Sequence, residues 1–379
     1  LGCMDMRGCG EMVTRWGTRF PAICEFNPHH PHAKTAYART SRLLHMWALK
    51  RPYREFRDRL ENSTREEIME KTYHFILNPV SRSGKGRKLW DTVIEPYLQA
   101  VNVSYEAHFS REAGDITRLT REIVSGNSWE PHRIVILGGD GTMDEALQGI
   151  DDLSQVALGY IPIGSGNDFS RDMPIPREPL KALKRILEAD DTTAVDIGTT
   201  TYGDGSSRRF IVSSGIGFDA AVCEETNRSE MKGFLNRIGL GKLTYLGIAL
   251  KQLFASRAVS CQIRIDDGDP ISVQKILFVA FMNHMYEGGG FKFAPHADYR
   301  DGLLDLCVVG DLSKALILAA LPTAFIGRHY MFRGITAYRA QKVEIRTSAP
   351  LWVHTDGEVE RRSDRLTVTC QHRALRMYI

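Results

Sequence analysis

One short stretch, Gly138-Gly139-Asp140-Gly141-Thr142, combines glycines with a carboxylate in a pattern that could bind a phosphate group or take part in its transfer. The β-branched apolar run at 134–137 predicts a buried strand before them, and the chain is expected to be helical from Thr142. A strand, a glycine turn and a helix together aim backbone N–H groups at an anion. Because a carboxylate would repel a phosphate, Asp140 indicates a divalent cation or a polarised hydroxyl between the two groups. The stretch therefore predicts a Mg-nucleotide or phosphoryl-transfer loop, with an ordinary strand–helix turn as the alternative.

Two more turns of similar character follow predicted strands. Strand 73–77 leads into Asn78-Pro79-Val80-Ser81 and a polar turn through Gly86, which a helix to Leu98 follows. A strand at 155–161 leads into Gly164-Ser165-Gly166-Asn167-Asp168-Phe169, and a short helix is expected after it. A further strand at 101–109 and a helix at 115–124 complete the pattern. In an open parallel α/β sheet, ligands bind at the end of the sheet where such turns meet.

The chain changes character after Ala194. Short alternating runs at 194–215, 259–310, 342–345, 351–354 and 366–370 predict a mostly β second domain. Helices are expected near 217–226, 230–256 and 313–329. The predicted domains are therefore 69–194 and 195–365. Residues 1–68 lack clear periodicity and are predicted to be an extension upstream of a natural start at Met69, with a basic lipid-binding arm as the alternative.

Composition restricts the class of protein. Of 379 residues, 43% are hydrophobic and 25% are charged, as in a globular protein, and no apolar run approaches the roughly 18 residues of a membrane span. Residues 1–68 carry 12 Lys and Arg against 8 Asp and Glu, so the formal charge of +3 leaves the remainder at −1. A neutral body gives no reason to expect nucleic-acid binding.

The positions of the cysteines and histidines indicate the redox compartment and the prospects for metal binding. The seven cysteines are scattered without a Cys-x-x-Cys pair, which favours a reducing, cytoplasmic location. His29-His30-Pro31-His32 could bind a metal, but no matched Cys or acidic ligand lies nearby in the sequence, so these histidines are expected to be adventitious.

Taken together, the motifs resemble those of the diacylglycerol-kinase catalytic-domain family, which includes bacterial lipid kinases, sphingosine kinases and ceramide kinases. The resemblance covers residues 72–379 and is carried by Asn78-Pro79 with Gly84, Gly138–Thr142, Gly164–Phe169, Gly215-Ile216-Gly217-Phe218-Asp219, Gly288-Gly289-Gly290 with Pro295, Asp301-Gly302-Leu303-Leu304-Asp305 and Asp356-Gly357-Glu358. It implies a two-domain α/β fold, with an N-terminal Rossmann-like nucleotide-binding domain and a C-terminal mostly β sandwich domain, as in NAD kinases and diacylglycerol kinases. It also implies that residues 366–379 return to the first domain.

The resemblance assigns residues to an ATP and Mg²⁺ site by position. It implies that Glu358 is the general base, since a carboxylate can accept the proton of an attacking alcohol, and that Asp140 contributes to catalysis. Without the resemblance, Glu358 would be read as a turn residue. The implied nucleotide-binding residues are Asn78, Pro79, Ser81, Ser110, Gly138, Gly139, Asp140, Gly141, Thr142, Asp144, Gly164, Ser165, Gly166 and Asn167.

Metal ligands are implied in the same way. Asp301, with backbone carbonyls at Asp298 and Leu303, matches a structural Mg²⁺ site of the family, and a hairpin turn is the equal alternative. Asp140 and Asp168 are candidates for organising the catalytic Mg²⁺, although Asp168 could instead cap the helix expected after it. The segment 231–257 mixes leucines with basic residues, and it could either rest on an anionic membrane or pack as a core helix.

These features predict an ATP- and Mg-dependent lipid kinase, with diacylglycerol as the first choice of acceptor and peripheral contact with a membrane. A sphingoid base, another long-chain alcohol or a glycolipid is the alternative acceptor, and a homodimer is a further expectation. NAD kinase is a more distant possibility, against which Asn78-Pro79 and Asp356-Gly357-Glu358 argue. A nucleotide-binding regulatory module without catalysis is the non-enzyme alternative, and the presence of both Asp140 and Glu358 argues against it.

Overall fold

The computed structural model describes residues 12–13, 19–20, 72–126, 130–228, 241–255 and 259–379. The chain divides into two compact units, Leu1–Ile68 and Met69–Ile379. In the first unit, β1 (Met12–Val13) and β2 (Arg19–Phe20) form an antiparallel pair. The rest of the predicted extension, including His29 to His32, and the predicted start at Met69 lie outside the described residues.

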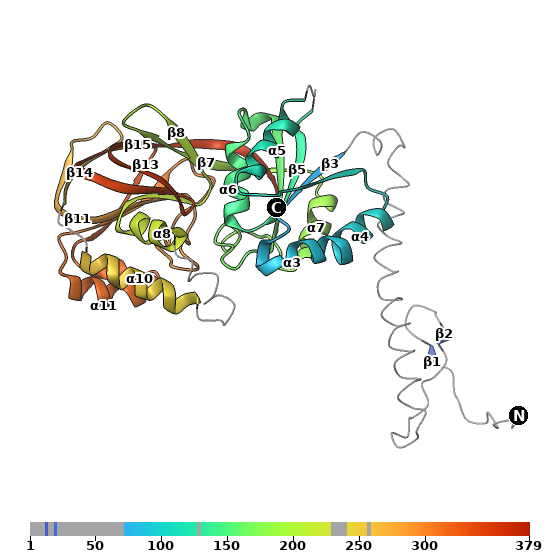
Figure 1. The fold of residues 1–379 in the computed structure, drawn as a ribbon, viewed down its shortest axis with the longest axis horizontal. Coiled ribbons are helices and arrows are strands. Elements are labelled where there is room, and N and C mark those ends of the chain that lie inside the picture. The colour runs from blue at the N-terminus through green and yellow to red at the C-terminus, as the bar shows by residue number, and fades with distance from the viewer. Residues whose placement is uncertain (1–11, 14–18, 21–71, 127–129, 229–240, 256–258) are drawn as a thin grey trace, which may run out of the picture. The chain divides into compact units, whose positions relative to one another are not determined.

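A parallel sheet forms the centre of the first domain (Figure 1). Its strands lie side by side in the order β6 (Val156–Pro162), β5 (His132–Gly138), β3 (Tyr73–Leu77) and β4 (Tyr105–Phe109). Successive residues of a strand point to opposite faces, so Ile134 and Ile136 enter one core while Val135 and Leu137 enter another. The apolar run therefore belongs to a strand buried on both faces, as in doubly wound folds.

Helices cover both faces of this sheet. α5 (Asp115–Val124) and α6 (Asp140–Gln148) contribute to the core on the side of Ile136. α3 (Ser81–Leu89), the π-helical η1 (Trp90–Ile94), α4 (Glu95–Ala100) and α7 (Pro179–Glu188) pack on the side of Leu137. The fully buried Trp90 packs against Phe75 of β3, with 5.4 Å between the ring centroids.

Several predicted boundaries are wrong, each for a local reason. The helix expected after Gly86 already begins at Ser81, because a glycine at 86 lets it approach the Asn78 carbonyl, which a Cβ atom would meet at 2.6 Å. The second strand begins at Tyr105 and not at residue 101, since Val103 N–H still bonds to Leu98 O of the preceding helix at 3.2 Å. The expected short helix after Phe169 is absent from the described chain, where turns and bends run on to α7.

The second domain is a β structure with helices on its outside. Its strands are β7 (Thr193–Tyr202), β8 (Ser207–Phe210), β9 (Ser213–Gly217), β10 (Val259–Ile265), β11 (Ile271–Met282), β12 (Leu304–Gly310), β13 (Ile335–Ala340), β14 (Lys342–Thr355) and β15 (Glu358–Tyr378). Its helices are α8 (Phe218–Arg228), α10 (Gly241–Ala255) and α11 (Lys314–Ala324), followed by the 3-10 turn η3 (His329–Met331). The helix predicted at 313–329 thus ends at Ala324, and only 241–255 of the segment predicted at 230–256 is described.

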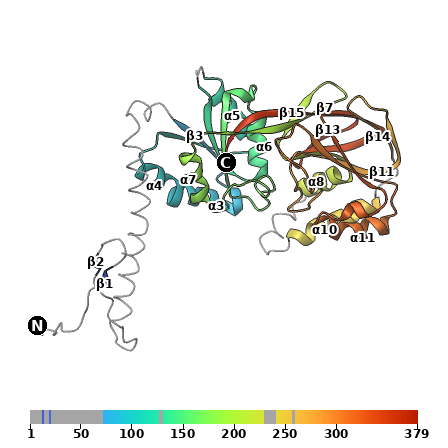
Figure 2. The same ribbon diagram turned by 180° about the vertical axis from the view of Figure 1, so that it is seen from behind.

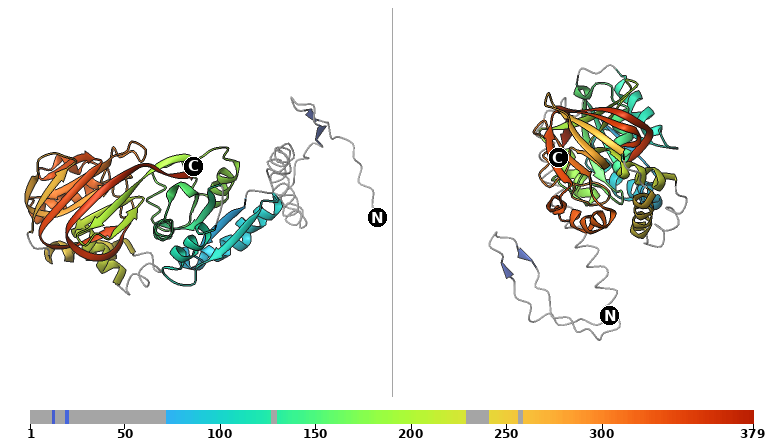
Figure 3. Two further views of the ribbon diagram at one scale, coloured as in Figure 1. Left: turned by 90° about the horizontal axis from the view of Figure 1, so that it is seen from above. Right: turned by 90° about the vertical axis from the view of Figure 1, so that its left-hand side faces the viewer.

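The strand β15 connects the two domains, as the red ribbon in Figures 2 and 3 shows. Its first half pairs with β14, and its last residues pair in parallel with β6, where Arg376 lies opposite Ala157. Figure 1 shows α10 and α11 below the strands of the second domain. Among the described helices, none is long and apolar enough to cross a membrane.

Candidate active site

The loop between β5 and α6 is tighter than the sequence predicts, because α6 begins at Asp140 and not at Thr142. The Gly139 carbonyl accepts the N–H groups of Thr142 (3.0 Å) and Met143 (3.2 Å). A Cβ atom on Gly138 would lie 2.4 Å from the Thr142 side chain, so a glycine is needed there. The first N–H groups of an α-helix have no acceptor within the helix. The amides of Asp140 and Gly141 therefore stand where an anion can bind.

The second glycine loop touches the first. Ile163 N–H donates to Gly138 O at 2.9 Å, and a Cβ atom on Gly164 would lie 2.7 Å from Gly139 Cα and 2.6 Å from Asn167 Oδ1. The Asn167 amide in turn donates to Gly164 O at 3.0 Å. The two glycine loops that the sequence predicts to share one site are thus in backbone contact.

Replacing Gly164 with alanine should separate these loops. The added Cβ has no room against the Gly139 backbone, so we expect Gly164→Ala to lower the free energy of unfolding by about 1–3 kcal/mol and to raise the KM for ATP. Gly247→Ala in α10 is the matched control, because a Cβ there meets no atom within 4 Å. Urea denaturation and steady-state kinetics measure both effects. Equal stability and equal KM in the two variants would show that the loops separate at no cost.

Asp140 holds the two loops together through its side chain. Its carboxylate accepts the N–H groups of Asp168 (3.0 Å) and Phe169 (3.3 Å). Burial, followed by the charge of Asp168, raises the pKa of Asp140 to about 6, although the two backbone N–H groups oppose the shift. Sequence reasoning predicts a catalytic role for this residue but not this bridging one.

Asp168 lies on the other side of Gly166. Its carboxylate accepts Arg171 Nε and the Gly289 N–H, each at 2.6 Å. The alternative role of Asp168 as a helix cap is wrong, because turns and bends follow it and the next helix, α7, begins only at Pro179. A Cβ on Gly166 would lie 3.2 Å from Asp140 Oδ2 and 4.0 Å from Asp168 Oδ2, so the two carboxylates face the same glycine. Neighbouring carboxylates form a donor set that a divalent cation fits, and such a cation would share Asp168 with Arg171.

Residues at the ends of β3 and β4 border the same edge. Asn78 N–H reaches Leu137 O at 3.4 Å, and its side-chain oxygen accepts the Val80 N–H at 3.1 Å, which shapes the turn through Pro79. Ser81 N–H donates to Asn78 O at 3.1 Å. Ser110 is buried, and its N–H donates to Leu77 O at 2.9 Å. These residues therefore lie at the carboxyl edge of the sheet, next to the end of β5.

Asp144, on the first turns of α6, lies at the contact with the second domain. It is fully buried, and its carboxylate is paired with the Arg208 guanidinium of β8. Arg208 also binds Glu360 at 2.7 Å. Burial, together with the nearby charge of Asp356, raises the pKa of Asp144 well above its usual range, and Arg208 opposes this shift. The predicted nucleotide-binding role of Asp144 stays a prediction, since the structure gives it an ion pair between the domains.

Glu358, the predicted general base, is the first residue of β15 and lies beside the nucleotide loop. Its Oε1 is 3.8 Å from the position that a Cβ on Gly141 would take. A two-residue turn brings it there, with positive φ at Asp356 (51°) and Gly357 (86°). Asp356 anchors the turn by accepting three backbone N–H groups at 2.8–2.9 Å, from Ile211, Val212 and Ser213. The turn residues Asp356-Gly357 thus place the carboxylate of the second domain next to the glycine loop of the first.

A buried polar cluster supports this turn from behind. His354 Nε2 lies 3.2 Å from Asp219 Oδ2 and 3.2 Å from Glu287 Oε1, while its Nδ1 accepts the Gly357 N–H at 3.3 Å. Ligand atoms of Asp219, Glu287 and His354 lie within 4.8 Å of one another, so the three side chains could hold a metal ion. Since the protein already satisfies both His354 nitrogens, the cluster is explained as a support for the turn.

The predicted metal-binding loop around Asp301 makes other contacts. The Asp301 carboxylate is paired with the Arg339 guanidinium and accepts the Leu303 N–H at 3.0 Å. The Asp298 carboxylate accepts the Arg300 N–H at 3.1 Å. The backbone carbonyl of Asp298 accepts the Asp301 N–H at 3.3 Å. A cation bound to the Asp301 carboxylate would have to compete with Arg339, so this metal site stays a prediction.

Sequence reasoning missed three contributors to the site: Arg208, His354 and Arg171. None lies in a glycine-rich turn, and nothing in the linear sequence joins Arg208 to Asp144. The signal for His354 was the two-residue spacing from Asp356, and the signal for Arg171 was its position three residues after Asp168. Both spacings along the sequence are compatible with a contact, but neither spacing predicts the contact without the fold.

Comparison with known proteins identifies the family. Residues 72–200 match the diacylglycerol kinase catalytic domain, and residues 211–379 match the YegS C-terminal NAD kinase beta sandwich-like domain. A protein of Xanthomonas euvesicatoria pv. vesicatoria, named "Probable lipid kinase YegS-like", is 30% identical over 290 residues, which cover 74% of this chain and 89% of that protein. The chain belongs to the diacylglycerol-kinase catalytic-domain family. Its two-domain α/β and β-sandwich architecture is the one predicted.

Other members of the family agree with this assignment. The Bacillus subtilis protein named diacylglycerol kinase is 28% identical over 292 residues, covering 76% of this chain and 90% of its own. The crystal structure of a diacylglycerol kinase from Bacillus anthracis str. Sterne superposes with a TM-score of 0.61 at 25% identity and covers 82% of this chain and 96% of that one. Membership supports a lipid kinase that takes its phosphoryl group from ATP, and the prediction of the family is confirmed.

Proposed function

We propose that this protein transfers the γ-phosphoryl group of Mg-ATP to the hydroxyl of a lipid, with diacylglycerol as the acceptor and phosphatidic acid as the product. The observation that carries the proposal is the position of Glu358, whose carboxylate from the second domain lies beside Gly141 at the start of α6. A protein that only binds a nucleotide has no need of a carboxylate there. The description of the matched domain and the names of relatives support diacylglycerol.

The arrangement gives each part of the site one task. The N-terminus of α6 and the Gly164 loop bind and orient the phosphates, since their glycines allow the backbone to approach. Glu358 accepts the proton of the attacking hydroxyl as its oxygen forms the new bond to phosphorus, and ADP leaves with the electrons of the bond that breaks. A bound Mg²⁺ would neutralise charge on the phosphates, and Asp140 and Asp168 would hold it.

The acceptor is tested by transfer of labelled γ-phosphate in mixed micelles. The panel contains diacylglycerol, monoacylglycerol, sphingosine, ceramide and a bacterial lipid extract, with Glu358→Ala as the blank. Label in phosphatidic acid that disappears with the blank supports the full proposal. Label in another lipid keeps the reaction and replaces the acceptor. Binding of ATP without transfer to any lipid would favour a regulatory module.

A lipid acceptor requires contact with a membrane, and we propose one surface for it. The turn after α11 exposes Phe325 (52%), Ile326 (64%) and Met331 (73%), a degree of exposure that is unusual for large apolar side chains. Arg328 and Arg333 are exposed on the same segment. Apolar side chains among basic ones suit an anionic bilayer. The residues described in 241–255 also expose Phe254, which lies near Lys314 at the start of α11, whereas 229–240 lie outside the described residues.

We expect Ile326→Asp to weaken binding to anionic vesicles by about tenfold, because it places a charge where an apolar side chain would enter the bilayer. Activity should fall on long-chain diacylglycerol in vesicles and stay unchanged on a short-chain, water-dispersed diacylglycerol. Ala337→Asp, which adds the same charge at an exposed position of β13, is the control. Vesicle sedimentation measures binding, and equal sedimentation of the two variants would place the membrane surface elsewhere.

A further inference from the structure

Two histidines and a glutamate gather on one face of the parallel sheet, in a place that the lipid-kinase reaction does not use. His74 lies opposite Glu106 in the pairing of β3 with β4, and His108 lies opposite Ile76 two residues further along. Since side chains alternate along a strand, His74, Glu106 and His108 project from the same face. β4 is the edge strand of the sheet, so solvent reaches the group from one side. Accordingly the Glu106 side chain is 61% exposed.

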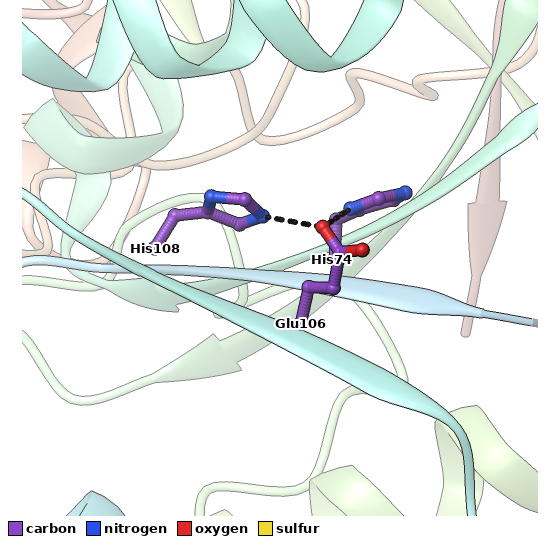
Figure 4. Close-up of side chains that lie close together, drawn as sticks. All are labelled: His74, Glu106 and His108. Atoms are coloured by element: carbon purple, nitrogen blue, oxygen red, sulfur yellow. Dashed lines mark ion pairs between the residues drawn. The ribbon is translucent and has the colours of Figure 1, made fainter.

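The three side chains converge on one point. Figure 4 shows the Glu106 carboxylate between the two imidazole rings. Its Oε2 lies 3.4 Å from His74 Nδ1 and 3.7 Å from His108 Nε2, and the ligand atoms all lie within 4.8 Å of one another. Ligands of a tetrahedral Zn²⁺ at about 2.0–2.2 Å from the ion are roughly 3.3–3.6 Å apart. The two separations from Glu106 Oε2, 3.4 and 3.7 Å, are close to that value.

The two facing ring nitrogens form ion pairs with Glu106 only if the rings are protonated. His74 Nδ1 and His108 Nε2 are inaccessible to solvent, and neither has a hydrogen-bond partner among the described residues. Burying such a nitrogen without a partner is unfavourable. A neutral imidazole nitrogen with a free lone pair is the form that ligates a metal.

The comparison with the His354 cluster shows why this group differs. There the histidine already contacts Asp219 and accepts the Gly357 N–H, so its nitrogens have partners within the protein. Here neither facing nitrogen makes a hydrogen bond to a described residue, and the carboxylate between them is largely exposed.

We propose that His74, Glu106 and His108 form a binding site for a Zn²⁺-class transition-metal ion, with water completing the coordination. Two imidazoles and one carboxylate suit Zn²⁺, Co²⁺ or Ni²⁺, whereas Mg²⁺ and Ca²⁺ prefer oxygen ligands only. The site is separate from the nucleotide site, because His74 and Glu106 are the second residues of β3 and β4, whereas the glycine loops, Asn78 and Ser110 follow the carboxyl ends of their strands. Binding there would clamp the edge strand β4 to β3.

The test is a Co²⁺ titration of the full chain without an affinity tag, followed by the visible absorption of the bound ion and run in excess Mg²⁺ to fill oxygen sites. We expect one Co²⁺ to bind, and Zn²⁺ to displace it. Glu106→Gln should weaken binding by at least about tenfold, and His108→Phe, which keeps the ring shape without a nitrogen, by about 100-fold. Because Glu106 is exposed, its variant should fold normally even if His108→Phe does not.

The control replaces His29, His30 and His32 with alanine, since these closely spaced histidines are one competing source of metal binding in the sequence. We expect this variant to bind Co²⁺ as the wild type does. Binding that is lost in this control and kept in Glu106→Gln, or the absence of any Co²⁺ binding by the wild type, would overturn the proposal. A rise in Tm with Zn²⁺ that Glu106→Gln reduces would support it further.

Discussion

Replacing Glu358 with glutamine should lower kcat for lipid phosphorylation by about 1,000-fold, because a general base contributes roughly 100- to 10,000-fold and glutamine cannot take the proton. The affinity for ATP should change little, since Glu358 lies beside the loop at Gly141 and is not among the backbone groups offered to the phosphates. The measurements are kcat with diacylglycerol micelles and the Kd for ATP by calorimetry. A kinase whose base is Glu358 should keep binding and lose rate.

The control for this experiment is Glu344→Gln. Glu344 belongs to the neighbouring strand β14, where its carboxylate binds Lys342 at 2.6 Å, and it should be dispensable for the reaction. If Glu358→Gln turns over as fast as this control, another group accepts the proton. If both kcat and ATP binding are lost, Glu358 is needed for the correct relative position of the two domains and is not the base.

The second large effect concerns Asp140 and pH. The pKa of this carboxyl is raised to about 6, so it gains a proton as the pH falls through that value and loses the charge that would attract a divalent cation. We expect kcat/KM for ATP to be level above about pH 7 and to fall about tenfold per pH unit well below pH 6. A bound cation favours the ionised form, so the fall in kcat, which reports the complex, should begin at lower pH.

Asp140→Asn tests the same residue without titration. Asparagine keeps one acceptor oxygen but turns an NH₂ group toward a backbone N–H of the Gly164 loop, so we expect kcat/KM to fall by at least about 100-fold at every pH. Asp364→Asn, at an exposed position of β15, is the control. A wild-type profile that stays level down to about pH 5, or a variant as active as this control, would remove Asp140 from the reaction.

The sequence by itself determined the architecture of the first domain and the place where its glycine loops meet. The β-branched run before Gly138 is apolar on both faces, which only a strand covered on both sides can bury, and the bounds of β3 at 73–77 and of α5 at 115–124 are confirmed. Glycines at 138, 139 and 164 mark where the backbone must come close, and the geometry at 138 and 164 leaves no room for a Cβ. These are local constraints, so they can be read from neighbouring residues.

Only the tertiary structure decided which side chains meet. Asp140 and Asp144 both looked like nucleotide ligands, yet Asp140 bonds to the amides of Asp168 and Phe169, while Asp144 pairs with Arg208 from the other domain. Glu358 reaches Gly141 because β15 leaves the hairpin at Gly357 and runs on to pair with β6. These contacts join residues far apart along the chain, and their energies arise from burial and pairing that exist only once both domains have folded.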